Sequence, residues 1–566
     1  MIRLLAPLVA SLLTATPAAA RAGFVFEDRN ADGVRQDGER GLAGVVVARG
    51  ATLVETDTQG RYELPASGSP DVGQPDGGSA GFVVLTRPSG YDCERWYRAD
   101  PGDFALVPRT ADGSSFVFAH VSDVHISDRV ADYAKFAVPS AIVVLPRWLR
   151  GKAVQWMLRF QDPDYSKRDV ARAMRSVVSQ HRDVSGWSDA SVMGEWVELL
   201  SQMSDDDERP PIDPVGDFEV SLDELRSLAP RFVVSTGDLV LESNEADAAT
   251  VDRWMTFYRR QTRATGLRFY DTIGNNEIAG SDNEDLVPGD RGYGKALFRA
   301  HFGPTHYSFD RGDLHFIALD THVLVDRDGE DWSFRTLDEG VRAWLEADLK
   351  QHAGRPTVVL NHEPFSDDPE WSRVVRAVSL VDRKVTEQLE QAGVRWTLAG
   401  HLHVNGLSES QATQHITTGA LSGMRWSFPS DAFARGYRLV QVRDGELYSV
   451  WKPTSEPVLG FVDPPSERAL HATAPRRTAP IGPGGSRRVV VAAVGVAGPF
   501  VGLHIRLDGR PLAIEHWSPY FAAAHYDASA LGSGEHTLVV EARRADGSVL
   551  RIRRLVTPLE AVESEQ

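Results

Sequence analysis

Five short segments place histidine, aspartate or asparagine directly after apolar runs. They are residues 123–125 (Asp-Val-His), 237–238 (Gly-Asp), 274–277 (Gly-Asn-Asn-Glu), 361–362 (Asn-His) and 400–403 (Gly-His-Leu-His). Imidazole, carboxylate and amide groups are common ligands of metal ions in proteins. The single cysteine, Cys93, excludes a cysteine-based zinc site and an internal disulfide. The pattern therefore predicts a metal centre built from nitrogen and oxygen ligands.

The apolar runs before these segments have the length and composition of β-strands. They include residues 116–121, 232–235, 316–319, 358–360 and 396–399. Helical spacing occurs between some of them, in parts of residues 248–260 and 385–391 and at Val341, Trp344, Leu345 and Leu349. Strands that alternate with helices indicate an α/β domain, in which ligands bind beyond the carboxyl ends of the strands. We therefore expect the five segments to converge at one edge.

In this order the segments resemble the signature of the calcineurin-like metallophosphoesterases. That signature is D-x-H, G-D, G-N-H-[DE], a histidine after an apolar strand, and G-H-x-H, and the likeness extends over roughly residues 115–451. The β-type flanks resemble those of an exported bacterial subgroup with extra N- and C-terminal β domains. The implied fold class is α/β, with a metallophosphoesterase-type β-sandwich core flanked by helices, a small N-terminal β domain and a C-terminal β-sandwich domain.

The resemblance also implies a role for each candidate ligand. One metal ion would be held by Asp123, His125 and His403, a second by Asn275, His362 and His401, and Asp238 would bridge them. The ions would be divalent or trivalent transition metals, and zinc, iron and manganese all suit this ligand set. A hydroxide bridging the two ions would attack the phosphorus of a phosphodiester or an activated phosphomonoester.

The third segment departs from the family signature, because Asn276 stands where the family has histidine. That histidine contacts the phosphoryl group and can protonate the leaving oxygen, whereas an amide cannot deliver a proton at neutral pH. General acid catalysis contributes about 10²–10⁴-fold, so its loss favours substrates with good leaving groups or another donor, such as His306 or His322. The alternative is a catalytically weakened or inactive protein that acts as a surface binding module.

A second departure is the long interval of 113 positions from His125 to Asp238. We expect a mainly helical insertion over residues 128–225, because apolar residues recur there at helical spacing. It would pack on the core as a helical subdomain or cover the metals as a lid. Two tryptophans, Trp148 and Trp156, lie close to basic residues and offer a further alternative, contact with a membrane surface or a long substrate.

The two ends of the sequence differ from its middle. Residues 1–22 have the basic start, apolar run and small residues of a secretory signal peptide, which predicts an exported protein, periplasmic or extracellular, after cleavage. Residues 23–110 and 456–566 consist of short β-type runs and turns, and residues 111–455 form the predicted catalytic domain. Three Asp-Gly pairs, at 444–445, 508–509 and 546–547, predict hairpins.

Residues 28–39 match the twelve-residue calcium loop D-x-[DN]-x-[DN]-G-x5-E. Gly33 permits the sharp turn of such a loop, which resembles the calcium loops of bacterial surface β domains. Helical periodicity is absent from its flanks, so a paired EF-hand is excluded. We expect a structural calcium ion or an acidic turn without an ion. The candidate ligands are Asp28, Asn30, Asp32, Val34 through its carbonyl, Gln36 and Glu39.

The overall composition restricts the partners. Hydrophobic residues make up 42% and charged residues 25% of the 566 residues, which is ordinary for a globular protein. The net charge of −18 argues against a nucleic-acid scaffold as partner and against general binding to anionic lipid. A phosphoester substrate is the expected partner. The sequence leaves the substrate, the metals and the oligomeric state open.

Overall fold

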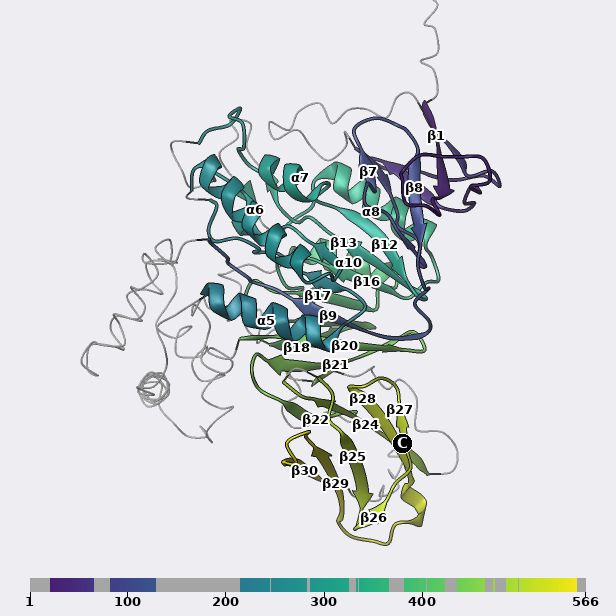
Figure 1. Ribbon diagram of the computed structural model, residues 1–566, viewed down its shortest axis with the longest axis vertical. Coiled ribbons are helices and arrows are strands. Elements are labelled where there is room, and N and C mark those ends of the chain that lie inside the picture. The colour runs from purple at the N-terminus through teal and green to yellow at the C-terminus, as the bar shows by residue number, and fades with distance from the viewer. Residues whose placement is uncertain are drawn as a thin grey trace, which may run out of the picture.

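The computed structural model of the chain describes residues 21–65, 82–128, 214–244, 246–281, 286–324, 332–333, 335–365, 381–403, 405–422, 435–463, 472–473, 485–496 and 498–556. Most of the predicted helical insertion, residues 129–213, and most of the predicted signal peptide lie outside these ranges. Figure 1 shows the helices and large sheets in the upper and middle part of the molecule, with the C-terminal strands below them.

Two six-stranded sheets form the centre of the molecule. The first has the order β11 (Phe269–Asp271), β10 (Val233–Ser235), β9 (Ser115–Val121), β20 (Gly436–Arg443), β21 (Glu446–Pro453), β23 (Ala472–Thr473). The second has the order β12 (Tyr307–Arg311), β13 (Leu314–Ala318), β16 (Thr357–Leu360), β17 (Trp396–Ala399), β19 (Thr413–Thr417), β18 (Gly406–Ser410). A separate pair joins β14 (Val323–Leu324) to β15 (Trp332–Ser333).

The two sheets bury their facing sides against each other. Phe118 of β9 stacks on Phe232 with ring centroids 5.1 Å apart, and its edge meets Phe316 of β13 at 5.7 Å. Successive side chains of a strand point to opposite faces, so the neighbours of Phe118 point outward. Val117 and Ala119 accordingly belong to a different hydrophobic cluster, on the other side of the sheet.

Helices cover the outer faces of both sheets. The bounds of the helices are α5 (Pro214–Leu228), α6 (Ala248–Ala264), α7 (Ala296–Phe302), α8 (Glu339–Gln351) and α10 (Arg383–Gln391). Helices α5 to α7 contribute to the cluster that contains Ala119, and α8 and α10 pack on Ile317 and Val359 of the second sheet. The predicted helices over 248–260, 341–349 and 385–391 are thereby confirmed. The centre is a four-layered helix–sheet–sheet–helix arrangement.

Parallel pairing brings the carboxyl ends of the key strands to a common edge. Strands β9, β10 and β11 are parallel in the first sheet, and β13, β16, β17 and β19 are parallel in the second. The five sequence segments with candidate ligands follow β9, β10, β11, β16 and β17. The expected convergence of these strand ends is therefore confirmed.

The N-terminal strands form two small sheets. One has the order β4 (Arg61–Leu64), β1 (Arg21–Glu27), β8 (Phe104–Pro108), β6 (Tyr91–Asp92). The other has the order β3 (Thr52–Glu55), β2 (Val46–Arg49), β5 (Val83–Leu85), β7 (Tyr97–Arg98). Their apolar residues, such as Val25 and Phe104, share one cluster with Phe118 between the large sheets.

The C-terminal strands form two four-stranded sheets. Their orders are β22 (Val458–Asp463), β24 (Ser486–Val494), β28 (Phe521–Asp527), β27 (Ile514–His516), and β26 (Arg510–Pro511), β25 (Gly502–Leu507), β29 (His536–Arg543), β30 (Val549–Val556). The three predicted Asp-Gly turns each join paired strands and are confirmed. Short helical turns complete the described elements at η3 (Asn275–Glu277) and η5 (Ala528–Ala530).

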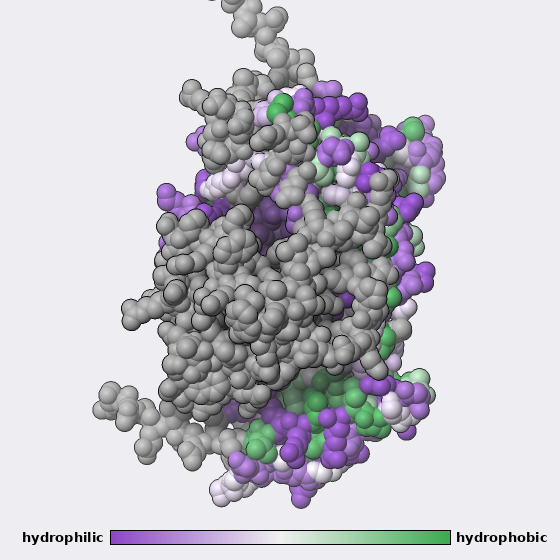
Figure 2. Space-filling view, turned by 90° about the vertical axis from the view of Figure 1, so that its left-hand side faces the viewer, coloured by the Kyte–Doolittle hydropathy of each residue, from purple (hydrophilic) through white to green (hydrophobic). Residues whose placement is uncertain are grey.

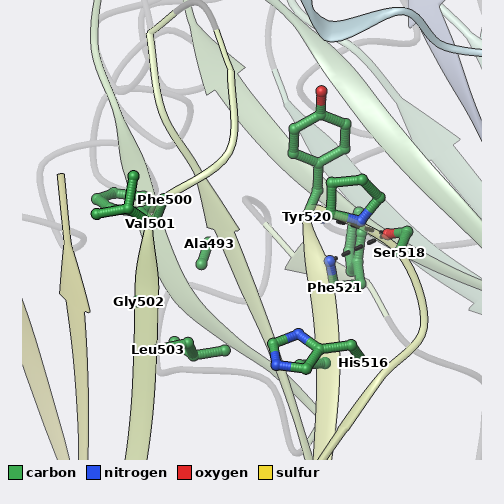
Figure 3. A pocket seen from close by; sticks show the side chains of 11 residues that line it. Ala493, Phe500, Val501, Gly502, Leu503, His516, Ser518, Tyr520 and Phe521 are labelled. Carbon is green, nitrogen blue, oxygen red and sulfur yellow. Dashed lines mark hydrogen bonds between the residues drawn. The ribbon is translucent and has the colours of Figure 1, made fainter. Parts of the chain in front are cut away.

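The C-terminal sheets carry a pocket. Leu503, His516 and Tyr520 are among the residues that line the pocket, and none of its lining residues is a carboxylate (Figure 3). On the face shown in Figure 2, hydrophobic residues gather near the bottom of the molecule, where these sheets lie. In the described part of the chain, none of the helices combines the length and apolar composition that crossing a bilayer requires.

Candidate metal centre

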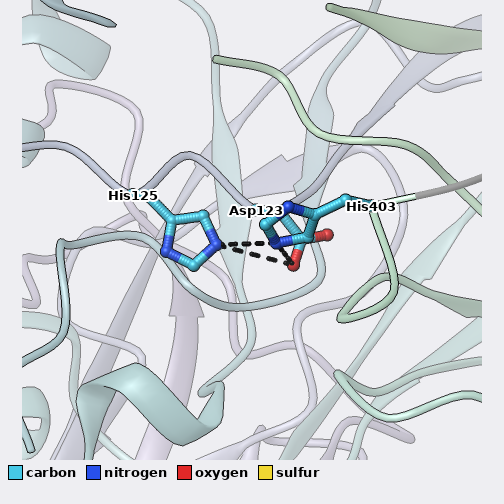
Figure 4. A group of neighbouring side chains, drawn as sticks. All are labelled: Asp123, His125 and His403. Carbon is cyan, nitrogen blue, oxygen red and sulfur yellow. Dashed lines mark hydrogen bonds and ion pairs between the residues drawn. The ribbon is translucent and has the colours of Figure 1, made fainter. Parts of the chain in front are cut away.

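The first group of predicted ligands consists of Asp123, His125 and His403. His125 Nε2 lies 2.9 Å from His403 Nε2, and both nitrogens face Asp123 Oδ1, at 3.9 Å and 3.3 Å (Figure 4). Asp123 and His125 follow β9, whereas His403 follows β17, so two sheets supply the group. All three side chains are buried.

The second group consists of Asp238, His362, His401 and Asn275. His362 Nε2 lies 3.1 Å from Asp238 Oδ2, 3.0 Å from Asn275 Oδ1 and 3.1 Å from His401 Nδ1. The same Asp238 oxygen lies 3.6 Å from His125 Nε2 of the first group. Asp238 therefore stands between the two groups, at the position expected of a bridging carboxylate.

The spacing of these atoms fits metal coordination. Ligand atoms about 2.1 Å from one ion at tetrahedral or octahedral angles are about 3.0–3.5 Å apart. Within each of two sets, Asp123 with His125 and His403, and Asp238 with His362 and His401, one donor atom per residue lies within 4.8 Å of the others. Imidazole nitrogens with carboxylate and amide oxygens are a donor set that zinc, iron and manganese accept. The residues present therefore fit a pair of transition metal ions.

The backbone adopts an uncommon conformation at most of these residues. Asp123, His125, Asp238, His401 and His403 have φ angles of 52°, 46°, 51°, 66° and 54°. A non-glycine residue in the left-handed region costs about 1 kcal/mol or more, and such residues concentrate at functional sites. The turns after β9, β10 and β17 thus adopt an energetically unfavourable backbone conformation that directs the predicted ligands toward one another.

Glycines in the segments permit close approach of the neighbouring chains. A Cβ atom on Gly400 would lie 2.4 Å from Asp123 Oδ2, and one on Gly274 would lie 2.4 Å from Asp238 Oδ1. Any larger residue at either position would displace a predicted ligand. The glycines of the G-D, G-N and G-H pairs therefore belong to the centre itself.

Glu277 braces the centre, a role that the sequence did not assign. Its Oε2 accepts hydrogen bonds from the backbone N–H groups of Gly274 and Asp238, at 2.7 and 3.0 Å. Its Oε1 accepts two more from Leu239 and Val240, at 2.7 and 3.1 Å. Burial and the negative charge of Asp238 raise the pKa of Glu277, whereas the hydrogen bonds from backbone N–H groups act in the opposite direction and favour the carboxylate. The only sequence signal was its fourth position in the Gly-Asn-Asn-Glu segment.

Hydrogen bonds and charges prepare the ligands for cations. His362 Nδ1 lies 2.7 Å from the carbonyl oxygen of Thr236, and the ring donates to this oxygen, which leaves Nε2 as a lone-pair donor. Burial alone would raise the pKa of Asp238, but His362 and His125 beside it lower that pKa well below its usual range. Burial lowers the pKa of His125 to about 4, so its ring is neutral and able to ligate at pH 7.

The side chain of Asn276 contacts two predicted ligands of the centre, although it is not a predicted ligand itself. Its Nδ2 lies 2.9 Å from His125 Nδ1, and its Oδ1 accepts a hydrogen bond from Asn275 Nδ2 at 2.9 Å. Its backbone N–H donates to Asp238 Oδ1 at 2.9 Å. Asn276 is 6% exposed, so it holds neighbouring ligands in place rather than standing open to a substrate.

The two alternative proton donors have other partners. His306 packs on Trp344 of α8 with ring centroids 4.7 Å apart, and burial lowers its pKa to about 4. His322 places Nε2 2.9 Å from Glu363 and Nδ1 3.2 Å from Asp320. Burial would lower the pKa of His322, but the two carboxylates raise it to about 9. Both imidazole rings are buried against these neighbouring side chains, which disfavours either histidine as a general acid for a bound substrate.

Comparison with known proteins identifies the family of the chain through its sequence. The calcineurin-like phosphoesterase family profile matches residues 116–405, just over half of the chain. No curated protein sequence matches the chain. Among solved structures, a dimetal phosphatase from Danio rerio is 15% identical over 42% of this chain and 86% of its own, with a TM-score of 0.28.

A second solved structure with a partial likeness is the purple acid phosphatase PPD1 from yellow lupin (Lupinus luteus) seeds. It is 12% identical over 73% of this chain and 67% of its own, with a TM-score of 0.32. The family assignment rests on the sequence match, whose span includes the five segments up to His403. This chain belongs to the calcineurin-like phosphoesterase family.

Proposed function

We propose that the chain is an exported, metal-dependent phosphoesterase that hydrolyses a phosphodiester or an activated phosphomonoester. One observation carries the proposal: seven side chains from five segments close into two groups that share Asp238. Its Oδ2 stands 3.6 Å from His125 Nε2 and 3.1 Å from His362 Nε2. Within each of two sets, Asp123 with His125 and His403, and Asp238 with His362 and His401, one donor atom per residue lies within 4.8 Å of the others, close enough for one ion to contact them all.

Each ligand would have a defined role. Asp123, His125 and His403 would hold one ion, and Asn275, His362 and His401 the other, with Asp238 on both. Two transition metal ions held in this way polarise phosphoryl oxygens and lower the pKa of a bound water molecule. Asp238 brings one negative charge between the two groups, which reduces the repulsion between two cations.

The leaving group sets the preferred substrate. Asn276 contacts His125 and cannot deliver a proton, and His306 and His322 are engaged with Trp344 and with two carboxylates. A poor leaving group needs a proton as its bond to phosphorus breaks, whereas an aryl oxide or a similarly stable anion does not. We infer that activated esters and diesters with good leaving groups react fastest.

Export is part of the proposal. Strand β1 begins at Arg21, and its first two residues pair with Leu64 and Glu63 of β4. Cleavage after Ala20 leaves this strand whole, whereas cleavage after Ala22 removes two paired residues. N-terminal sequencing of the mature protein, after cell fractionation, tests both the export and the cleavage position. Residues 23–110 and 456–566 are proposed as an N-terminal and a C-terminal β domain that pack against the catalytic domain.

The activity is tested on the purified mature protein by metal analysis and by hydrolysis of bis-p-nitrophenyl phosphate and p-nitrophenyl phosphate. We expect about two transition metal ions per chain and hydrolysis that a chelator abolishes and metal restores. Asp238→Asn should lose bound metal and reduce turnover at least about 100-fold, because it removes the shared charge. Asp313→Asn, an exposed aspartate in the turn after β12, is the matched control and should retain both.

The outcomes separate the proposal from its alternative. Metal binding without turnover on either ester would favour a surface binding module built on the same fold. Absence of bound metal in the wild-type protein, or unchanged metal content in Asp238→Asn, would contradict the assigned centre.

A further inference from the structure

We propose that residues 28–39 bind a calcium ion in the N-terminal sheets, at a site that the phosphoesterase centre does not use. The segment begins directly after β1 and ends just before Gly41, which pairs with Phe26 of β1 in an isolated β-bridge. Its twelve residues have the spacing of a calcium loop, with acidic or amide residues at positions 1, 3, 5, 9 and 12 and glycine at position 6. Gly33, at position 6, has a φ of 77°, which a side chain would strain.

The base of the loop is fixed on both sides. The backbone N–H of Asp28 donates to the carbonyl oxygen of Leu106 in β8 at 2.9 Å, and that of Glu27 donates to the Arg40 carbonyl at 2.9 Å. The buried carboxylate of Glu27 also pairs with Arg29 Nε and Arg40 Nη2, each at 2.7 Å. The first ligand position and the residue after the last one are thus held by the sheet, which reduces the entropy lost on binding an ion.

The observation that points to a ligand is the side chain of Asp28. It is 1% exposed, and its Oδ2 accepts a hydrogen bond from the Gly33 N–H at 2.8 Å, so the carboxylate points into the loop. Its Oδ1 is buried and has no hydrogen-bond partner. A buried carboxylate oxygen without a partner is unfavourable, and a cation inside the loop would supply the missing interaction.

Hydrogen bonds within the loop link the other ligand positions to one another. Asp32 Oδ2 accepts hydrogen bonds from Asn30 Nδ2 at 2.9 Å and from Gln36 Nε2 at 2.5 Å. Both oxygens of Glu39 reach back to the loop, accepting from the N–H groups of Arg29 at 3.1 Å and Gln36 at 3.0 Å. With the carbonyl of Val34 at position 7, the loop offers the six to eight oxygens that calcium takes.

The basic residues of the loop have partners elsewhere. Arg29 pairs with Glu27, and the Arg35 guanidinium lies 4.0 Å from the centroid of the Phe24 ring. Neither of these guanidinium groups neutralises the carboxylates of Asp28, Asp32 and Glu39. Three carboxylates with several neutral oxygens favour a hard divalent cation, and the two oxygens of Glu39 suit calcium better than the smaller magnesium.

Calcium binding to the full mature protein is measured by titration calorimetry after chelator treatment, with calcium and then magnesium as the only added ions. The transition-metal centre is first loaded, so that its ligands are occupied. We expect one calcium ion per chain and binding of magnesium at least 10-fold weaker. Asp28→Asn and Glu39→Gln should each weaken calcium binding at least 10-fold. Asp37→Asn, an exposed acid of the same loop at a position without a ligand role, is the matched control and should bind as the wild type.

Thermal unfolding provides an independent readout. Calcium should raise the Tm of the wild type and of Asp37→Asn but not that of Asp28→Asn, because a ligand stabilises only the state that binds it. Without calcium, Asp28→Asn should unfold at or above the wild-type Tm, because it removes a buried negative charge with one oxygen that lacks a partner. Absence of calcium binding by the wild type at millimolar concentration would overturn the proposal, as would wild-type affinity in both Asp28→Asn and Glu39→Gln.

Discussion

The geometry of the candidate metal centre depends on residues that hold a strained backbone in place. Five predicted ligands have positive φ angles, and the carboxylate of Glu277 gathers four backbone N–H groups around the turns that carry Asp238 and Asn275. Such a network keeps a turn in a conformation that its own torsional preferences oppose. Residues that touch no substrate therefore decide whether the ligands stay aligned.

Glu277→Gln tests this bracing role. Glutamine retains one acceptor oxygen but replaces the other with an NH2 group that faces backbone N–H donors. We expect a loss of about 1–3 kcal/mol in unfolding free energy and metal affinity about 10–100-fold lower. Urea unfolding and metal titration measure the two effects. Glu346→Gln, at an exposed position of α8, should change neither, and wild-type metal affinity in Glu277→Gln would contradict the role.

Asn276→His tests the missing proton donor. Restoring the imidazole should leave the metal content unchanged and raise turnover most on esters with poor leaving groups, because only these need a proton. The measurement is the dependence of kcat on the pKa of the leaving group, which should become flatter in the variant. The contact of Asn276 with His125 makes the opposite result informative, since lower turnover on every substrate together with lost metal would assign Asn276 a purely positioning role.

The residues of the site were largely predictable from the sequence, but their surroundings were not. Order and spacing pointed to the five segments, because each follows an apolar strand, and the resemblance to the family signature supplied the seven proposed ligands within them. The contact of Asn276 with His125 and the four bonds of Glu277 depend on where separate strands meet, which one-dimensional spacing does not contain. The partners of His306 and His322 come from α8 and from the segments around Glu363 and Asp320, so the sequence left both as candidate donors.

At the level of elements, β13 and α8 are joined by a buried ion network. His315 of β13 lies with Nδ1 2.8 Å from Asp310 and Nε2 2.7 Å from Asp348 of α8. Burial would lower the pKa of His315, but the two carboxylates raise it to about 9. The apolar runs predicted both elements, whereas a histidine within a strand gave no sign that it would bind a helix.

The network predicts how stability changes with pH. Because the pKa of His315 is higher in the folded state than its usual 6.5, its contribution is complete below about pH 6.5 and is lost as pH rises through 9. The difference corresponds to about 3 kcal/mol. The stability gap between the wild type and His315→Gln, measured by urea unfolding, should therefore shrink by about this amount between pH 6.5 and 9.5. His525→Gln, at an exposed position of β28, should give a gap that is small at both pH values, and a pH-independent gap for His315→Gln would contradict the prediction.

At the level of the whole molecule, the flanking sheets share hydrophobic clusters with the centre. Val490 and Phe521 of the C-terminal sheets lie in one cluster with α5 and α6, and Tyr520 donates a hydrogen bond to the Leu228 carbonyl at 2.7 Å. The N-terminal sheets share the cluster between the two large sheets. Composition predicted β-rich flanks, but contacts between segments hundreds of residues apart left no pattern in the sequence.

Arg87 joins the N-terminal sheets to the centre in an unusual way. Its guanidinium is buried among aromatic rings, 4.4 Å from the centroids of Trp96 and Tyr270 and 5.5 Å from that of Phe309. Its Nε and Nη2 have no hydrogen-bond partner. The cation–π contacts offset part of the cost of burying this charge, and the side chain also fills the space between the sheets.

Substitutions of Arg87 should separate packing from charge. Arg87→Ala leaves a cavity and should lower the unfolding free energy by about 3 kcal/mol. Arg87→Met keeps most of the volume and removes two buried nitrogen atoms without hydrogen-bond partners, so its unfolding free energy should lie within about 1 kcal/mol of the wild type or above it. Urea unfolding measures both, with Arg95→Met at an exposed position of the same segment as control.

Hydrogen exchange should show β5 and β12 losing protection together in Arg87→Ala, because the two sheets meet through this side chain. Equal losses in the alanine and methionine variants would show instead that the charge on the rings, and not the volume, holds the flanking sheets to the centre.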